Sequence, residues 1–446
     1  MIHSEPNMNP IQKFAAINVY DASLWHLGFN TIQELETDLG ILASGKEEVY
    51  GCIFGRDSLI TALKLIRVYE FTNDGYFLKL VRKILQTLAD LQGKEVNIES
   101  GEEPGKCIHE YRPSNHEHLT KKPTKPWFLY ADNVMRNYDS IDSTALFLIT
   151  AYQYLEISHD EGFIKRILPN IHSALEWHML YGDKNKDSFI DYQLHPNRKS
   201  GGLSTQSWMD SSESVFHEDE SEVAYPVAPV EVQAYAYLAY KVWGTYFSKF
   251  DNERGHVLLS KASALKANFN QSFVSGTSHF RVASAIDGNG KPLISERSSM
   301  GHCLWASWTT IEGNRDSIIH EEYVPRLVER LMDPDIFEPK AGIRTLSKKS
   351  RCFSANSYHN GSIWPHDTSI VAGGMESFGF KEEAHKIRVA LLGALKHFAT
   401  PIELFVYTDN TYAEYCSPHG QRACKKQAWC AASLLKEVLL QSNSQT

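Results

Sequence analysis

The sequence has few of the features expected of a secreted, membrane-spanning or zinc-binding protein. Its seven cysteines are an odd number, lie scattered and include no Cys-x-x-Cys pair, which argues against a disulfide framework and a zinc site. No window approaches about 18 uninterrupted apolar residues, and Met1–Phe14 lacks a basic segment followed by an apolar run. Neither export nor membrane insertion is therefore predicted, and the cytoplasm is the expected location.

Positive charge is also in short supply. The chain has 45 basic and 54 acidic residues, for a net charge of -9, which is the wrong sign for binding nucleic acid or an anionic membrane. Hydrophobic residues make up 42% of the 446 residues, enough for a large core. These bulk properties favour a globular protein with a neutral partner.

Segments that alternate with period two are rare, and we find only short strand candidates, near residues 279–285 and 403–407. There is no βαβ alternation and no short repeat, which disfavours a doubly wound sheet or a solenoid. Helical spacing instead predicts about a dozen helices, over residues 11–39, 57–72, 75–93, 143–155, 162–180, 230–243, 247–273, 298–309, 324–331, 362–378, 381–398 and 425–440. Paired helices joined by long loops predict an all-α fold, an (α/α)6 barrel. We expect one catalytic domain over residues 1–446, with a tail at 1–15 and the long loops gathered around one funnel.

One long loop carries Trp208 and Asp210. An indole can stack on the C–H face of a pyranose, and a nearby carboxylic acid can protonate a glycosidic oxygen. A surface aspartate beside a core tryptophan is the alternative interpretation of so short a motif.

Two further stretches concentrate polar groups at the start of a predicted helix. Arg56 and Asp57 offer a donor fork and an acceptor that can grip neighbouring sugar hydroxyls, although Asp57 can also cap its helix. The stretch from Tyr358 to Asp367 holds more hydrogen-bonding groups than packing alone requires, which favours a functional site.

Near the C-terminus, Glu403 and Glu414 are both candidates for a second catalytic carboxylate, and either can equally be an ordinary surface acid. The segment Gly182–Asp191 has acidic spacing like the start of an EF-hand loop, but Ser188 occupies the glycine position and Leu194 the position of the bidentate glutamate. A polar turn is the better interpretation. We expect no cofactor and no catalytic metal.

Seven stretches, in this order, resemble the amylo-α-1,6-glucosidase module of glycogen debranching enzymes and, more widely, glucoamylase-like exo-glycosidases. They are Gly55–Ser58, Glu102–Glu110, Asp139–Thr144, Trp208–Asp210 with Pro229–Glu231, His359–Asp367, Glu403–Phe405 and Gln427–Trp429. The resemblance covers roughly residues 50–440 and implies an (α/α)6 barrel and an inverting glucosidase.

Carried over to this sequence, the resemblance implies that Asp210 is the general acid and Glu403 the general base. It implies that Arg56 and Asp57 hold the terminal glucose. The other substrate-binding residues that we predict are Glu110, Asp142, Trp208, Glu231, His359, Asn360, Trp364, His366 and Asp367.

Some alternatives remain open at this stage. Glu414, in Glu-Tyr-x-x-Pro, resembles the base stretch of related glucosidases and competes with Glu403. The chain begins almost directly at the predicted barrel, so the neutral α-glucoside is either an α-1,6-linked glucan or a small glucoside. A phosphorylase on the same barrel would need a basic pocket, for which Arg422, Lys425 and Lys426 are the nearby candidates, and a non-catalytic sugar-binding protein would need neither acid.

Overall fold

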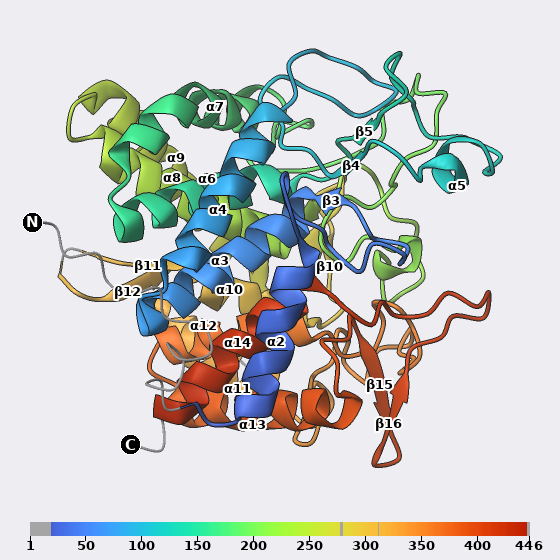
Figure 1. The fold of residues 1–446 in the computed structure, drawn as a ribbon. Coiled ribbons are helices and arrows are strands. Elements are labelled where there is room, and N and C mark those ends of the chain that lie inside the picture. The colour runs from blue at the N-terminus through green and yellow to red at the C-terminus, as the bar shows by residue number, and fades with distance from the viewer. Residues whose placement is uncertain (1–18, 277–279, 311, 444–446) are drawn as a thin grey trace, which may run out of the picture.

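The computed structural model describes residues 19–276, 280–310 and 312–443. Their longer helices are separated by loops, short helical turns and short strands (Figure 1). The helices are α2 (Ala22–Leu35), α3 (Gly55–Thr72), α4 (Gly75–Asp90), α5 (Glu117–Thr120), α6 (Asp142–Ser158), α7 (Glu161–Leu180), α8 (Val230–Phe247), α9 (Asn252–Ser272), α10 (His302–Trp305), α11 (Val324–Met332), α12 (Pro365–Ser377), α13 (Lys381–Phe398) and α14 (Ala428–Asn443), with 3-10 turns η1 (Ser212–Ser214), η2 (Ser298–Gly301) and η3 (Glu321–Tyr323).

The helices form two concentric rings. Neighbours in the inner ring pack in the order α3, α6, α8, α10, α12 and α14, and α14 returns to pack on α3. The outer helices each pack against an inner partner: α4 on α3, α7 on α6, α9 on α8, α11 on η2, α13 on α12 and α2 on α14. The predicted (α/α)6 barrel is therefore confirmed.

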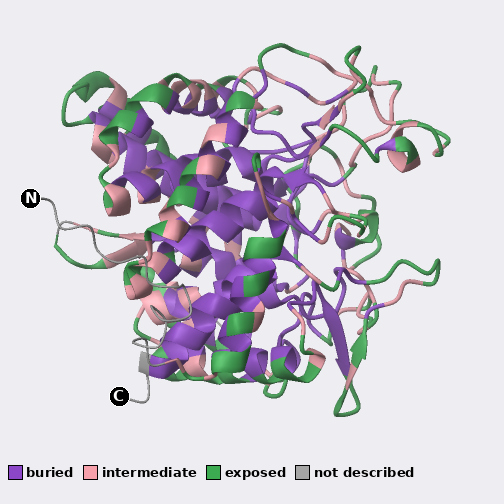
Figure 2. Cartoon of the chain, viewed as in Figure 1, coloured by how far each residue is buried: buried purple, intermediate pink, exposed green. Residues whose placement is uncertain are grey.

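Burial explains which helices lie inside. In α8 nearly every residue from Val230 to Gly244 is buried, and alanines at 234, 236 and 239 allow close approach of neighbouring helices. In the outer helix α4, the buried residues instead recur at helical spacing, from Phe77 to Leu88. Figure 2 shows the buried core running through the helical barrel, while exposed residues gather on outer helices and loops. One hydrophobic cluster extends from Leu24 to Leu439.

The strands are short and lie mostly in the loops between the helices. Figure 1 shows strands β3, β4, β5, β10, β15 and β16 on one side of the helical barrel. The strands are β1 (Glu36–Thr37), β2 (Gly40–Ile41), β3 (Ile53–Phe54), β4 (Glu110–Arg112), β5 (Met135–Asn137), β6 (Ala228–Pro229), β7 (Val274–Ser275), β8 (Arg281–Val282), β9 (Ala285–Ile286), β10 (Pro292–Leu293), β11 (Ser307–Thr309), β12 (Arg315–Ser317), β13 (Phe337–Glu338), β14 (Gly342–Ile343), β15 (Phe405–Thr408) and β16 (Thr411–Glu414).

Three of these strands tie together the loops that precede inner helices. Strand β4 pairs antiparallel with both β3 and β5, so that Phe54 lies opposite Glu110 and Glu110 opposite Asn137. The start of α3 is thereby fixed against the loop that leads into α6. A second hairpin, β15 with β16, pairs Phe405 with Glu414.

Two helix predictions need correction. The helix predicted over 298–309 is only the turn η2 and the single-turn helix α10, and Ser307–Thr309 form β11, which pairs with β12. The run Trp308-Thr309-Thr310 has aromatic and β-branched side chains that favour a strand. The helix predicted over 11–39 begins at Ala22, where Asp21 accepts the Ser23 and Leu24 amides, and ends at Leu35; residues 11–18 lie outside the described residues.

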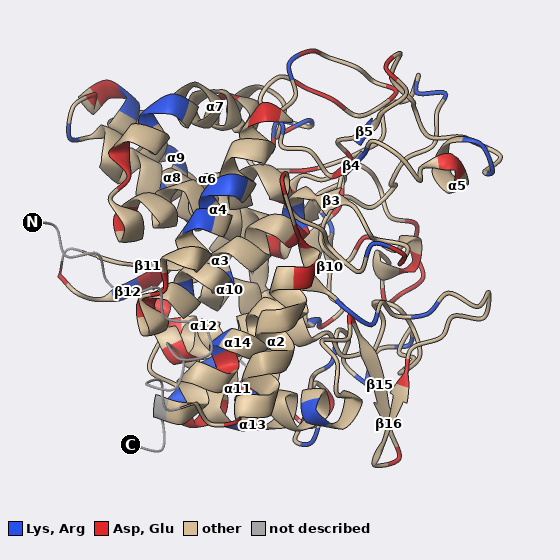
Figure 3. Ribbon diagram, in the orientation of Figure 1, with Lys and Arg blue, Asp and Glu red and all other residues tan. Residues whose placement is uncertain are grey.

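Charge is mixed over the surface. Figure 3 shows acidic and basic residues interspersed along the helices and loops of the face in view. Among the described residues, no helix is long and apolar enough to cross a membrane.

Candidate active site

Four acidic residues begin inner helices. Asp57, Asp142, Glu231 and Asp367 lie in the first turns of α3, α6, α8 and α12, respectively. The N-terminal end of a helix carries a partial positive charge, which favours a carboxylate there. The polar motifs identified in the sequence therefore mark helix starts.

A pocket of about 370 Å³ opens among the loops that precede and follow these helices. Its lining combines aromatic rings with hydrogen-bonding groups, as a sugar site requires. The lining residues are Tyr50, Phe54, Arg56, Asp57, His109, Trp208, Asp210, Tyr358, His359, Trp364, Glu403, Gln427 and Trp429. Asp210 and Glu403, almost two hundred residues apart in the chain, thus line the same pocket.

Arg56 organises one side of the pocket. Its Nε lies 2.6 Å from Oδ2 of Asp142, its Nη1 lies 3.1 Å from Oδ2 of Asp210, and its Nη2 donates to the carbonyl oxygen of Ser207 at 2.8 Å. Arg56 and Asp142 are buried, whereas the Asp210 side chain is 26% exposed. The buried Asp142 thus fixes the guanidinium of Arg56, and this guanidinium in turn holds the partly exposed Asp210.

Glu403 also lines the pocket and is 1% exposed. The hydroxyl of Tyr358 donates to its Oε1, and the backbone amide of Cys424 donates to its Oε2 at 2.7 Å. The Tyr358 oxygen also lies 3.1 Å from that of Tyr50. Both carboxylate oxygens are therefore held in place by donors.

Burial raises the pKa of each carboxyl group in the pocket. The pKa of Asp210 rises to about 6, although the Arg56 guanidinium opposes the rise. The pKa of Glu403 rises to about 7, against the hydrogen bonds from Tyr358 and Cys424, and that of Asp57 also rises to about 7. These acids can therefore gain or lose a proton near neutrality. By contrast, burial lowers the pKa of His359 well below its usual range, so this imidazole is neutral.

Trp208 lines the pocket and lies within an aromatic cluster. Its ring stacks on His302 with centroids 5.9 Å apart and meets His359, Trp364 and His366 edge to face. The indole is almost wholly buried. Trp208 therefore contributes a rigid apolar ring to the pocket lining.

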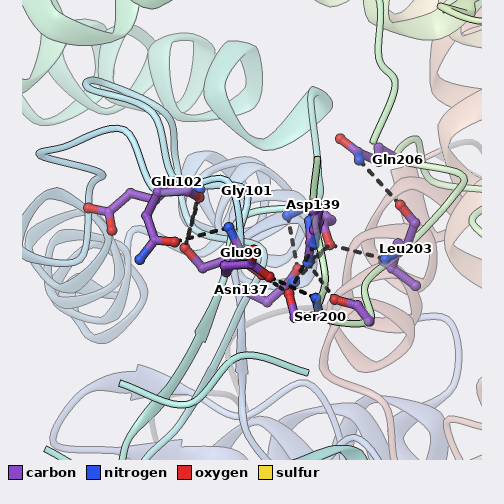
Figure 4. Close-up of polar contacts among 12 residues, drawn as sticks. Glu99, Gly101, Glu102, Asn137, Asp139, Ser200, Leu203 and Gln206 are labelled. Atoms are coloured by element: carbon purple, nitrogen blue, oxygen red, sulfur yellow. Dashed lines mark hydrogen bonds and ion pairs between the residues drawn. The ribbon is translucent and has the colours of Figure 1, made fainter. Parts of the chain in front are cut away.

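A buried ion pair holds the loop that leads to Asp210. The guanidinium of Arg198 lies 2.7 Å from Oδ1 and 3.0 Å from Oδ2 of Asp139. Oδ2 of Asp139 also accepts the Leu203 backbone amide at 3.0 Å and the Asn137 side-chain amide at 2.8 Å (Figure 4). We call this ion pair the Asp139–Arg198 clamp, and the loop that contains Arg198, Leu203 and Asp210 the acid loop. The clamp thus anchors the acid loop to β5 and the start of α6.

The chain matches one known family over most of its length. Residues 126–436 match the family model described as amylo-alpha-1,6-glucosidase. The chain belongs to this family. A search of curated proteins gives no match to this member of the amylo-α-1,6-glucosidase family.

Several solved structures that share this fold are glycosidases. The GH63 mannosylglycerate hydrolase from Thermus thermophilus in complex with glucose is 13% identical, with a TM-score of 0.64, and the alignment covers 93% of this chain and 99% of that one. The same enzyme in complex with Tris and D-glycerate is 12% identical, with a TM-score of 0.64 and the same coverage. A wild-type glycosidase is 11% identical, with a TM-score of 0.54 and coverage of 98% and 99%. The family match identifies this chain as a glycoside hydrolase, and the solved structures share its fold.

Several predicted substrate-binding residues lie behind the pocket wall of this family member. Asp142 holds Arg56, and Glu110 is buried beside Arg112, whose Nε donates to it. Glu231 lines a separate cavity behind the acid loop, and Oδ1 of Asn360 accepts from Arg297 at 2.7 Å. These residues support the pocket from outside its lining.

His366 and Asp367 also lie outside the lining. The His366 ring stacks on Trp429 at a centroid distance of 3.7 Å, and Oδ1 of Asp367 lies 2.7 Å from Nε2 of His302. Both side chains are fully buried at the start of α12. These two side chains support the aromatic cluster around Trp208 from outside the pocket lining.

Glu414 lies at the surface on β16. Its side chain is 39% exposed, and it pairs with Lys425 and, at 4.0 Å, with Arg422. It is absent from the pocket lining. Glu414 pairs with Phe405 in the β15–β16 hairpin, whereas Glu403 precedes β15 and is not part of that hairpin.

The sequence analysis missed six lining residues as site residues: Tyr50, Phe54, His109, Tyr358, Gln427 and Trp429. His109, Gln427 and Trp429 stood inside stretches that carried the family resemblance, and Tyr358 directly precedes one, so that each had a signal. Phe54 likewise directly precedes such a stretch, Gly55–Ser58, whereas Tyr50 had no signal, because it joins the pocket only through the folding of the loop before α3.

A group of three acids with spacing suited to a cation, Asp183, Asp187 and Asp191, occurs elsewhere in the described chain, in the loop after α7. Asp191 accepts backbone amides of Lys184 and Asn185, and Asp183 accepts those of Asp187 and Ser188. These bonds are those of a polar turn.

Proposed function

We propose that this protein is an inverting exo-glycosidase that releases terminal glucose from an α-glucoside, with Asp210 as general acid and Glu403 as general base. The observation that carries the proposal is that both carboxyl groups line one pocket together with Arg56 and several aromatic rings. The family membership supports the substrate class, which is an α-1,6-linked glucan or a small glucoside or disaccharide.

In the proposed reaction Asp210 gives its proton to the glycosidic oxygen as the bond from that oxygen to the anomeric carbon breaks. Glu403 takes a proton from a water molecule whose oxygen bonds to the anomeric carbon from the other face. One displacement inverts the anomeric centre. Proton exchange with solvent then restores the acid and the base.

The contacts of each carboxyl group support these roles. The hydrogen bonds from Tyr358 and Cys424 stabilise Glu403 as a carboxylate, which is the form of a base. Asp210 is closer to solvent and has a pKa raised by burial to about 6, so that a protonated fraction persists near neutral pH. Asp57 and the neutral His359 line the same pocket and can accept sugar hydroxyls.

The same contacts disfavour the other functions considered. Lys425 pairs with Glu414, Lys426 pairs with Glu34, and Arg422 lies near Glu414, and none of the three lines the pocket. A phosphorylase would need a cation beside Glu403. A protein that only binds sugar would need no second acid in the pocket.

The test is hydrolysis of a panel of glucosides by the whole protein. We expect glucose release from at least one of maltose, isomaltose, kojibiose, trehalose, sucrose, glucosylglycerate and limit dextrin, and mannosylglycerate should be included because a structural neighbour hydrolyses it. NMR of the first sugar released should show the inverted anomer. A retained anomer would refute the pairing of Asp210 with Glu403, and turnover that depends on inorganic phosphate would favour a phosphorylase.

A further inference from the structure

Arg297, directly before η2, is a buried cation outside the pocket lining. Its side chain is 4% exposed, and its hydrogen bonds within the described residues go to neutral acceptors rather than to a carboxylate. Burial lowers its pKa to about 10. Removing a charge from water is costly unless the surroundings compensate, so a buried arginine without a carboxylate partner calls for a specific role.

The acceptors around Arg297 belong to two separate stretches of the site. Its Nη2 donates to the carbonyl oxygen of Ser214 at 2.6 Å, and its Nη1 contacts Sδ of Met209 at 3.5 Å. Its Nη1 also donates to the carbonyl oxygen of His359 at 2.8 Å, and its Nη2 to Oδ1 of Asn360 at 2.7 Å. One guanidinium therefore joins both flanks of Asp210 to the stretch that carries His359.

Residues of the acid loop line two different cavities. Trp208 and Asp210 line the pocket, whereas Ser207 and Met209 line a second cavity of about 340 Å³ on the other face of the loop. Arg297 lines this second cavity as well. Since side chains that line a cavity have fewer packing partners on that side, the hydrogen bonds of Arg297 there add to the packing of Trp208 in holding the loop.

We propose that Arg297 is a positioning residue for the general acid: its guanidinium holds the Asp210 loop against the His359 loop across the cavity. This inference rests on the proposed function, because it takes Asp210 as the acid. A planar guanidinium directs several donors in a fixed fork, which the single ammonium group of lysine does not reproduce. Arg297→Lys should therefore fail to restore the function of Arg297→Met.

The leaving group separates an effect on the acid from a general loss of structure. A poor leaving group, such as the sugar of a disaccharide, needs the proton of Asp210, whereas fluoride leaves without one. For Arg297→Met and Arg297→Lys, we expect kcat/KM to fall about 10²-fold on the disaccharide that the wild type hydrolyses best, as for a misplaced catalytic group. Activity on the glucosyl fluoride of the same anomeric configuration should fall less than about tenfold.

Arg388 provides the matched control. It is a buried arginine of α13 that pairs with Glu437 and Glu376, away from the acid loop. Arg388→Met should lower the Tm without changing the ratio of the activity on the disaccharide to the activity on the glucosyl fluoride. The KM for the glucosyl fluoride should stay near the wild-type value in the Arg297 variants.

Three outcomes decide the inference. Equal losses on both substrates, or no loss on either, would overturn the positioning role while leaving the proposed function intact. A wild-type protein that hydrolyses no glucoside of the panel would instead refute the proposed function, and this role with it. If Arg297→Met does not fold, Arg297→Lys gives the same comparison, because it retains the buried charge.

Discussion

At the scale of single residues, the two glutamates near the C-terminus have opposite surroundings. Glu403 is buried in the pocket with two donors on its carboxylate, and Glu414 is exposed beside Lys425. We expect Glu403→Gln to lower kcat about 10²–10⁴-fold, because the attacking water loses its base. Glu414→Gln should leave kcat within about twofold, since an exposed ion pair contributes little.

Added azide sharpens this comparison, because a small anionic nucleophile needs no base. Azide should restore turnover of Glu403→Gln on an activated glucoside and have no effect on Glu414→Gln. If Glu414→Gln lost activity and azide restored it, Glu414 rather than Glu403 would be the general base.

The protonation of the two acids predicts the pH dependence. Glu403, with a pKa of about 7, must be ionised, and this requirement makes the rate rise with pH. Asp210, with a pKa of about 6, must be protonated, and this requirement makes the rate fall with pH. The profile of kcat/KM should therefore be a bell with its maximum between about pH 6 and pH 7. Because the pKa of Glu403 lies above that of Asp210, the singly protonated molecules carry the proton mainly on Glu403.

The substitution Tyr358→Phe tests whether the pKa of Glu403 sets the alkaline limb of this pH profile. The hydrogen bond from Tyr358 lowers the pKa of Glu403, so its loss should raise that pKa. The upper limb of the bell should move to higher pH and the maximum should become lower. An upper limb that stays in place would contradict the assignment of Glu403 as the base.

At the scale of elements, loops without regular structure position the acid, and the Asp139–Arg198 clamp fixes one of them. Both side chains are almost fully buried. Arg198→Met should lower the free energy of unfolding by about 3–5 kcal/mol, because it leaves a buried carboxylate without its cation. Urea unfolding measures this change, and kcat/KM should fall as the acid loop loses its anchor.

Arg136 is the control for the clamp. It pairs with Asp132 in the neighbouring loop, but this pair is partly exposed. Arg136→Met should therefore cost no more than about 1 kcal/mol. Equal losses in the two variants would show that the clamp contributes no more than a surface pair.

At the scale of the whole molecule, closure of the helical ring creates the site. Helix α14 packs on both α2 and α3, so the last helix meets the first helices of the barrel. This closure brings Gln427 and Trp429, at the start of α14, into the same pocket as Arg56 at the start of α3. A site with contributions from residues 50 to 429 exists only when the ring is complete.

The sequence by itself determined most of the helices, because apolar spacing and chain-breaking loops are local properties. It placed the inner helix starts through their motifs, and with them Arg56 and Asp57, and it assigned Trp208 and Asp210 to a long loop. It failed at 298–309, where strand pairing between β11 and β12 outweighs the local helical pattern.

Only the tertiary structure decided which polar residues face the pocket. Asp142, Glu231 and Asp367 have the same sequence signature as Asp57, an acid in the first turn of an inner helix, yet they lie behind the wall. Burial depends on partners from other segments, as Glu403 demonstrates through its contacts with Tyr358 and Cys424. Local sequence specifies a helix and its cap, but the direction of a side chain toward a shared pocket is fixed by long-range packing.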